Sequence, residues 1–267
     1  MPIQAIYGAV MSELNPIRRA WAEQQPAFGV FMSIPSPYAI ELCASAGIDY
    51  VCIDMQHGLS SYASLPAEIA ACHAGGAAPI VRPAANEFWQ IGRALDLGAL
   101  GVLVPLVSSP EEAAAAVSAC RYGPAGRRSY GPTLISRVVG SSDPATLEHE
   151  ALCIVMIETL EGLDKVEQIA AVPGLDGIYY GPADLAISLG VTPAEAADNR
   201  EHAGAIERIR RAAETNGIAA GAHCNTGVQA RARADQGFTF ITVTSDSRAL
   251  SVGVEQELAV ARAQLPR

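Results

Sequence analysis

The chain has 267 residues, half of them hydrophobic, and 18 basic against 28 acidic side chains give it a formal net charge of −10. This acidic balance repels phosphate backbones and anionic lipid headgroups, so it argues against nucleic-acid or membrane-surface binding and favours a small-molecule ligand. No apolar stretch approaches the roughly 20 residues that a membrane helix needs.

The first predicted element is an amphipathic helix at residues 12–24, and eight short apolar runs follow it. Runs without polar alternation are typical of strands covered on both faces of a parallel sheet, and alanine-rich segments with helical periodicity separate them. The predicted strands are 28–32, 50–54, 78–82, 101–105, 153–158, 177–180, 218–223 and 239–244. The predicted helices include 37–46, 64–74, 87–97, 111–120, 162–171, 202–216, 228–236 and a last one at 249–263.

Eight strand–helix units in succession predict the α/β class and a (β/α)8 TIM barrel, formed as a single domain by residues 1–267. The irregular segment 122–147, rich in Gly, Pro, Arg and Ser, is predicted to form a long loop between the fourth helix and the fifth strand. Loops of this length are usually functional or interfacial. A doubly wound open sheet is the alternative, but no G-x-G-x-x-G motif follows the first strand.

Cysteine usage indicates a reducing compartment. The six cysteines form no C-x-x-C pair, and several lie inside apolar runs, so we interpret them as buried thiols rather than disulfides or zinc ligands. The sequence therefore predicts a cytoplasmic location. The cysteines are at positions 43, 52, 72, 120, 153 and 224.

Polar side chains follow four of the predicted strands at their carboxyl ends, where the chemistry of a (β/α)8 barrel is located. The second strand ends at Asp54 with His57 shortly after it, the third ends at Arg82, the fifth ends at Glu158, and Asp184 lies in the turn after the sixth. Each also has an ordinary structural interpretation, as a helix cap, an ion-pair partner or a solvated loop residue. Because all of them are predicted on one rim, we interpret them together as a candidate active site.

Two of these carboxylates predict a metal site. Glu158 and Asp184 follow adjacent strands, and no cysteine or tight histidine cluster accompanies them. Carboxylate oxygens are ligands for hard cations such as Mg²⁺ or Mn²⁺, which also take water and a chelating substrate. Next to them, the segment Gly181, Pro182, Ala183 and Asp184 opens a predicted helix, whose free N–H groups and positive dipole end can bind a substrate carboxylate.

Asp96 lies near the end of a predicted helix, where the helix dipole disfavours a negative charge and flanking leucines indicate partial burial. A cationic partner would relieve both costs. We expect His57 in that role, because a carboxylate on one imidazole nitrogen fixes the tautomer and raises the basicity of the other. A surface position for Asp96 is the alternative.

The chain has one lysine, Lys165, inside the predicted helix after the fifth strand and so on the outer layer. Schiff-base aldolases and pyridoxal-phosphate enzymes need a lysine at the barrel mouth, and a P-loop needs Gly-Lys-Ser/Thr. The sequence therefore argues against all three. His223 and Asn225, at the end of the seventh strand, are candidates to line the substrate site, or they are ordinary polar loop residues.

Seven ordered motifs carry a family resemblance across residues 26–260. They are Asp54-x-x-His57, Val81-Arg82-Pro83, Leu95-Asp96-x-Gly98, Val104-Pro105, Arg121-Tyr-x-Pro-x-Gly126-x-Arg128, Ile157-Glu158-Thr159 and Gly181-Pro-Ala-Asp184-Leu. In this order they resemble the HpcH/HpaI family of class II, metal-dependent pyruvate aldolases, which includes 4-hydroxy-2-oxoheptanedioate and 2-dehydro-3-deoxy-sugar-acid aldolases.

The resemblance implies a divalent ion (Mg²⁺, Mn²⁺ or Co²⁺) held by Glu158 and Asp184 and chelated by pyruvate or a related 2-oxo acid. It implies that Arg82 contacts the keto oxygen and that His57, supported by Asp96, is the base. The resulting enolate adds to an aldehyde, or a 4-hydroxy-2-oxo acid is cleaved in reverse. The resemblance also implies a homo-oligomer, a hexamer, whose active sites a neighbouring subunit completes, with the segment 121–137 as a candidate contact.

The chain departs from the family pattern at two positions. Gln56 replaces an acid that commonly precedes the histidine, and Met156 replaces a polar Gln near the metal ligands. Two other functions stay open. One is a citrate-lyase-β-like enzyme acting on acyl-CoA thioesters, and the other is a catalytically inactive barrel that serves as a binding module.

Overall fold

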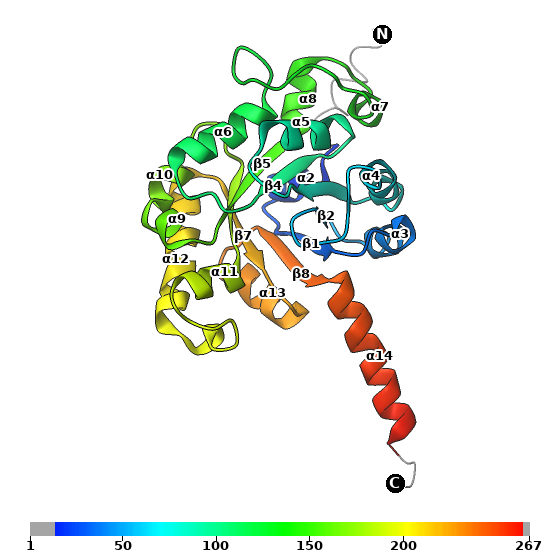
Figure 1. Ribbon diagram of the computed structural model, residues 1–267, viewed down its shortest axis with the longest axis vertical. Helices are drawn as coiled ribbons and strands as arrows, with labels where there is room; N and C mark the ends of the chain where they lie inside the picture. The colour runs from blue at the N-terminus through cyan, green and yellow to red at the C-terminus, as the bar shows by residue number, and fades with distance from the viewer. Residues whose placement is uncertain (1–13, 264–267) are drawn as a thin grey trace.

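A closed barrel of eight parallel strands, paired in chain order, forms the centre of the computed structural model, which describes residues 14–263 (Figure 1). The strands are β1 (Ala27–Met32), β2 (Tyr50–Asp54), β3 (Ala78–Arg82), β4 (Gly101–Val104), β5 (Leu152–Ile157), β6 (Gly177–Tyr180), β7 (Ala219–His223) and β8 (Phe240–Ser245). The predicted TIM barrel is confirmed, with each strand within a few residues of its predicted place.

Helices cover the outside of the barrel and connect the strands. They are α3 (Pro37–Ala44), α4 (Leu65–Ala74), α5 (Phe88–Asp96), α6 (Pro110–Cys120), α9 (Leu160–Asp164), α10 (Val166–Ala170), α11 (Pro182–Ser188), α12 (Arg200–Asn216) and α13 (Gly227–Asp235), with a 3-10 turn η1 (Ala196–Asp198). One more helix, α14 (Asp246–Arg262), follows the last strand. Proline at the first helical position and a serine cap start several of them, as at Ser36-Pro37 and Ser109-Pro110.

Side chains alternate along each strand between two apolar layers, which explains the absence of polar alternation in the sequence. Val51 and Ile53 of β2 face the helices, whereas Tyr50 and Cys52 face the barrel interior. Inside the barrel, Tyr50 stacks on Phe240 with ring centroids 4.1 Å apart. Both layers are shielded from water, so every strand gains stabilisation from two hydrophobic faces.

The N-terminal helix α2 (Pro16–Ala22) closes the amino end of the barrel. Asn15 caps it and donates hydrogen bonds to the carbonyl oxygens of Leu100 and Glu150, while Trp21 donates to the carbonyl of Thr239. The helix was predicted at 12–24, and residues 12 and 13 lie outside the described part of the chain. With the amino end closed, ligand access is at the carboxyl ends of the strands.

The segment predicted as a long loop, 122–147, contains helical structure. Two short helices, α7 (Ile135–Val139) and the first residues of α8 (Pro144–Glu150), interrupt it. Ile135, Val139 and Leu147 are buried against residues at the amino end of the barrel. Burial of these apolar side chains stabilises the two helices. The abundance of Gly and Pro had instead predicted an irregular loop.

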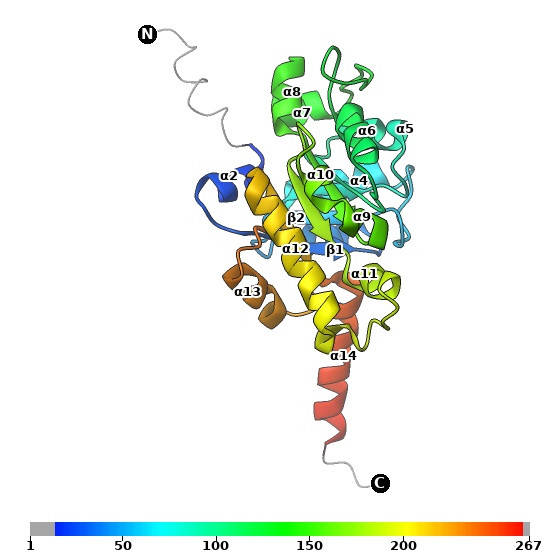
Figure 2. The ribbon, with the colours of Figure 1, turned by 90° about the vertical axis from the view of Figure 1, so that its left-hand side faces the viewer.

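The last helix, α14, projects away from the barrel instead of covering it (Figures 1 and 2). Its first residue, Asp246, is buried, but the following turns lie in the open, and Leu250 and Val254 are 61% and 59% exposed. Phe28 of β1 and Val243 of β8, which face outward where an eighth helix would pack, stay partly exposed. None of the helices within residues 14–263 combines the length and apolar character needed to cross a bilayer.

Candidate active site

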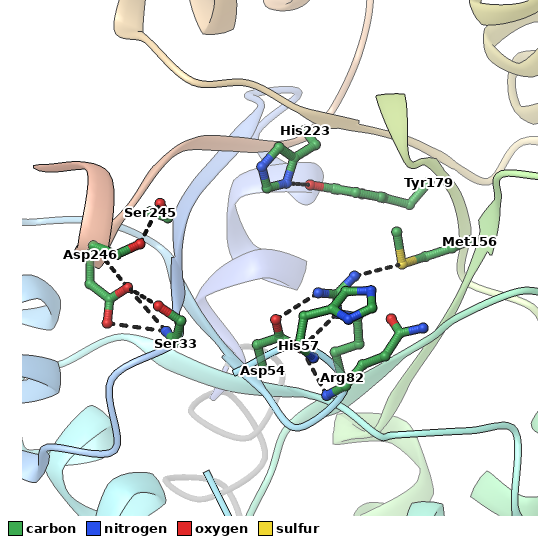
Figure 3. A network of polar contacts seen from close by, with 11 residues as sticks. Ser33, Asp54, His57, Arg82, Met156, Tyr179, His223, Ser245 and Asp246 are labelled. Carbon is green, nitrogen blue, oxygen red and sulfur yellow. Dashed lines mark hydrogen bonds and ion pairs between the residues drawn. The ribbon is translucent and has the colours of Figure 1, made fainter. Parts of the chain in front are cut away.

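A buried ion pair between Arg82 and Asp54 lies at the centre of the carboxyl end of the barrel (Figure 3). Arg82 Nε donates to Asp54 Oδ1 at 2.8 Å and Nη2 donates to Oδ2 at 2.6 Å, a bidentate geometry. The two residues end neighbouring strands in register, β2 and β3, which places them side by side. Fork-shaped pairing of this kind fixes the plane of the guanidinium.

The charges of this pair are maintained despite burial. Burial alone would raise the pKa of Asp54, but the hydrogen bonds and charge of Arg82 outweigh it and the pKa is lowered. The backbone N–H groups of Gln56 and His57 also donate to Asp54 Oδ1, at 3.0 and 3.2 Å. Burial would likewise lower the pKa of Arg82, and Asp54 raises it. Asp54 thus holds both the guanidinium and the loop that carries His57.

The remaining surface of Arg82 is covered by soft groups. Its guanidinium carbon lies 5.0 Å from the ring centroid of Phe31, and Nη1 contacts the Met156 sulfur at 3.8 Å. A thioether is a weak acceptor, so Nη1 keeps most of its donor capacity for a substrate oxygen. His57 is exposed beside the pair, with its ring available to a ligand (Figure 3).

Glu158 lies directly after β5 and is only 2% exposed. Its Oε1 accepts a hydrogen bond from the backbone N–H of Leu106 at 2.8 Å. Leu106 adopts a left-handed backbone with φ 56°, a strained conformation for a leucine, next to this carboxylate. Burial raises the pKa of Glu158, and the charge of Asp184 raises it further while Arg82 acts in the opposite direction.

Asp184 does not cap a helix. Gly181 is the N-cap of α11, Pro182 is its first residue, and the exposed Asp184 lies in the first turn. A side chain at Gly181 would collide with Glu158 Oε2, so glycine lets the backbone of this turn approach the carboxylate closely. The capping interpretation of Asp184 was wrong, and the carboxylate instead lies near enough to Glu158 to affect its pKa.

Glu158 and Asp184 fit a hard divalent cation in their chemistry. Of the two carboxylate oxygens of Glu158, Oε1 alone accepts a hydrogen bond from residues 14–263. Oε2 and the carboxylate of Asp184 are therefore available to a ligand. A cation between two such carboxylates relieves the repulsion that raises the pKa of Glu158. No group of three or more His, Cys, Asp or Glu suited to a metal occurs in the described part of the chain, so further ligands would be water or substrate.

Asp96 has the cationic partner that the sequence predicts, but this partner is Arg128 and not His57. Arg128 Nη2 donates to Asp96 Oδ1 at 3.0 Å, and the guanidinium lies 4.6 Å from the Tyr122 ring centroid. Asp96 is the last residue of α5, which returns from the carboxyl end of β3 to the amino end of β4. Within one chain it is therefore at the opposite end of the barrel from His57.

His223 ends β7 and faces into the same site as Arg82 (Figure 3). Its Nδ1 is 3.2 Å from the Tyr179 hydroxyl, and its ring meets the Phe31 ring edge-on at 4.9 Å. Burial, then the charge of Arg82, lowers the pKa of His223 to about 4, although Asp54 acts against this. Asn225, the other candidate, lies in the following exposed loop.

Asp246 is a structural carboxylate that the sequence analysis did not single out. It accepts hydrogen bonds from the backbone N–H groups of Ser33 and Ile34 and from the Ser33 hydroxyl, at 2.8–3.1 Å. It thereby attaches the start of α14 to the loop after β1 (Figure 3). In the sequence, the only indication of this role is that Asp246 is an acidic residue two positions after a predicted strand with a polar end.

Lys165 lies at the junction of α9 and α10, where it forms an ion pair with Glu161 at 2.7 Å. This is the outer helical layer, as predicted. All six cysteines are free, five of them buried, also as predicted. The fold and the site together define a (β/α)8 barrel that carries an arginine, a histidine and two acidic residues at the carboxyl ends of its strands.

Comparison with known proteins agrees with this class. The family model described as HpcH/HpaI aldolase/citrate lyase matches residues 27–251. The hydroxypyruvate/pyruvate aldolase of Rhizorhabdus wittichii is 36% identical over 250 residues, covering 94% of this chain and all of that protein. The 4-hydroxy-2-oxo-heptane-1,7-dioate aldolase of Klebsiella pneumoniae is 36% identical over 209 residues, covering 76% of this chain and 79% of that protein.

Solved structures give the same result. An HpcH/HpaI aldolase/citrate lyase family protein from Burkholderia cenocepacia superposes with a TM-score of 0.85 at 31% identity, covering 93% of this chain and 99% of the other. A citrate lyase beta subunit from M. tuberculosis, at 19% identity and a TM-score of 0.57, shares the fold alone. The chain belongs to the HpcH/HpaI aldolase/citrate lyase family and is a carbon–carbon lyase of the aldolase type.

Proposed function

We propose that the protein is a divalent-metal-dependent aldolase that joins pyruvate or a related 2-oxo acid to an aldehyde, or cleaves the 4-hydroxy-2-oxo acid product. The observation that carries the proposal is the buried Glu158, which has one oxygen free of hydrogen bonds to residues 14–263 and lies close enough to Asp184 and Arg82 for their charges to affect its pKa. The curated relatives named as aldolases support the same reaction class.

Each residue has a role that follows from its contacts. Glu158 and Asp184 would hold Mg²⁺, Mn²⁺ or Co²⁺, which supplies Lewis acidity toward the keto oxygen of the oxo acid. Arg82, fixed by Asp54, donates Nη1–H to that keto oxygen and stabilises the negative charge that develops there. The segment Gly181–Asp184 orients the substrate carboxylate through the backbone N–H groups of its first turn.

His57 is the proposed base. Its exposed ring takes a proton from the methyl carbon of the oxo acid, this carbon then bonds to the aldehyde carbon, and the aldehyde oxygen takes up a proton. Because Asp96 is at the other end of the barrel in the same chain, its predicted support of His57 requires a contact between copies. That requirement agrees with a hexamer whose sites a neighbour completes.

The experiment that tests this function starts from chelator-treated protein, which is incubated with pyruvate and a panel of aldehydes. Turnover should appear on addition of Mg²⁺, Mn²⁺ or Co²⁺ and stop on addition of chelator. Turnover that ignores both would contradict the metal-dependent mechanism. Cleavage of acyl-CoA thioesters without aldol products would favour the citrate-lyase-like function, and no turnover of either kind would favour a binding module.

We infer that α14 forms the contact between copies. It is a 17-residue helix with exposed apolar side chains at Leu250, Val254 and Leu258, spaced four residues apart on one face. Phe28 of β1 and Val243 of β8 face outward and stay partly exposed because α14 does not pack over them, so the corresponding helix of a second copy can cover them. Tyr38 and Leu42 of α3 supply exposed apolar surface beside this position.

Introducing charge on this face should dissociate the oligomer. We expect the double variant Leu250→Asp/Val254→Asp to sediment as a monomer of 27.8 kDa, because carboxylates buried in an apolar interface lose hydration without gaining a partner. Gln256→Asp adds the same group on the opposite face of α14 and should keep the wild-type mass. Analytical ultracentrifugation distinguishes the two, and an unchanged mass for the double variant would exclude α14 from the interface.

A further inference from the structure

A chain of hydroxyl groups crosses the barrel interior beneath the site and ends at His223. The Tyr50 hydroxyl lies 3.1 Å from Thr242 Oγ1, which lies 2.8 Å from the Tyr179 hydroxyl, which lies 3.2 Å from His223 Nδ1. Tyr50, Tyr179 and Thr242 are fully buried. The apolar barrel core offers few other partners, so these four groups must satisfy one another.

The direction of the chain follows from its far end. Within residues 14–263 the Tyr50 hydroxyl contacts Thr242 and no other hydrogen-bonding group. If Tyr50 donates to Thr242, Thr242 to Tyr179 and Tyr179 to His223, each of the three hydroxyl protons has an acceptor. The reverse direction leaves the Tyr50 proton buried without an acceptor, which costs free energy. His223 Nδ1 is therefore an acceptor, and the neutral ring carries its proton on Nε2.

The surroundings of the ring keep it neutral. Phe31 contacts both the His223 ring, at 4.9 Å, and the Arg82 guanidinium, at 5.0 Å. A protonated His223 would place a second cation beside Arg82 in a partly buried position, and burial and Arg82 lower the pKa of His223 accordingly. No protein acceptor for Nε2 is present within the described residues. The site therefore contains a neutral N–H donor of fixed orientation next to the cationic Arg82.

We propose that His223 donates this Nε2–H to a hydroxyl oxygen of the substrate and so determines specificity for hydroxylated substrates. The proposal rests on the aldolase function and deepens it. A neutral donor suits a neutral hydroxyl, whereas Arg82 and the proposed cation suit the charged oxygens of the oxo acid. The hydroxyl belongs either to a 3-hydroxy-2-oxo acid or to a hydroxyaldehyde. Tyr179 is a positioning residue, since it acts through the tautomer of His223.

The test compares substrates that differ by one hydroxyl in wild type and in His223→Phe, which keeps an aromatic ring against Phe31. One arm measures the ratio of kcat/KM for hydroxypyruvate over pyruvate with a fixed aldehyde, and the other arm the ratio for glycolaldehyde over acetaldehyde with pyruvate. We expect His223→Phe to lower one ratio by about 3- to 10-fold, the scale of one neutral hydrogen bond, and that arm identifies the source of the hydroxyl. Both ratios within twofold of wild type would overturn the proposal.

Two further variants separate hydrogen bonding from packing. His223→Gln keeps an N–H donor at a similar reach and should retain most of the preference, whereas Tyr179→Phe releases the tautomer and should lose it although the imidazole remains. His73→Phe is the matched control, because His73 also makes one ring hydrogen bond, to the Gly98 carbonyl at 2.8 Å, but at the amino end of the barrel. It should leave both ratios unchanged.

A spectroscopic measurement tests the tautomer without any turnover. In protein labelled with ¹⁵N-histidine, the signals that disappear in His223→Gln should show a protonated Nε2 and an unprotonated Nδ1 at neutral pH. A proton on Nδ1 would contradict the direction of the hydroxyl chain and the proposal with it. An inactive wild type with the expected tautomer would instead overturn the aldolase function, and with it the substrate role of His223, while leaving the hydroxyl chain in place.

Discussion

Glu158→Gln is expected to lower kcat of the aldol reaction by a factor on the order of 10³ or more. The change removes one of the two negative charges that would hold the divalent cation, and Lewis-acid stabilisation by a metal ion contributes several kcal/mol to a transition state. The amide keeps the shape of the side chain, and its oxygen can still accept the hydrogen bond from Leu106 N–H. Initial rates at saturating pyruvate and metal, together with calorimetric titration of the metal, measure both effects.

The matched control is Glu161→Gln. Glu161 is three residues further along the chain but lies on the outer layer, paired with Lys165 at 2.7 Å. It should bind metal and turn over like wild type, since an exposed pair of this type contributes little. If Glu158→Gln kept wild-type metal affinity and kcat, the metal would be held elsewhere and the proposed mechanism would be wrong.

The barrel was predictable because strand burial leaves a direct mark on the sequence. Strands such as 50–54 and 101–104 are buried on both sides, and this double burial appears as a short apolar run between helical segments. Closed topology then places every strand end on one rim, so the positions of Arg82, Glu158 and Asp184 followed from chain order alone. This reasoning needs no knowledge of side-chain partners.

The partners themselves could not be predicted, because they depend on packing between distant segments. Asp54 was recognised as part of a motif, yet its bidentate contact with Arg82, 28 residues away, is visible only in the structure. The need of Asp96 for a cation was predicted correctly, but Arg128 supplies it from a segment whose buried helices the sequence did not indicate. Local sequence reveals that a charge needs a partner and not which side chain provides it.

Two further features depend on geometry that no periodicity contains. The pattern of α14 predicts a helix with an apolar face, but not that the helix projects away from its own barrel (Figure 2). The role of His223 depends on three hydroxyls from β2, β6 and β8, which the barrel brings together although they are up to 192 residues apart in sequence. Both features depend on how distant segments are arranged in space rather than on neighbouring residues.

Arg82→Lys is expected to lower kcat by about 10² or more, the scale observed when one donor that stabilises a developing oxyanion is removed. Lysine keeps the positive charge beside Asp54 but has no fork, so it cannot pair with both carboxylate oxygens and still present an N–H to the keto oxygen. Steady-state kinetics with pyruvate should show the loss mainly in kcat, because the contact strengthens as charge develops on the oxygen.

Lysine is more informative here than alanine. Arg82→Ala would leave the buried Asp54 carboxylate unpaired, and breaking a buried pair in this way costs roughly 3–5 kcal/mol of stability, so lost activity could follow from unfolding. The control is Arg208→Lys, which changes an arginine paired with both carboxylate oxygens of Glu167 on the outer helices and should leave kcat within about twofold of wild type. A near-wild-type kcat for Arg82→Lys would show that a positive charge at this position is sufficient for catalysis. The pairing of Arg82 with Asp54 would then serve the stability of the barrel mouth and not the orientation of a donor toward the substrate.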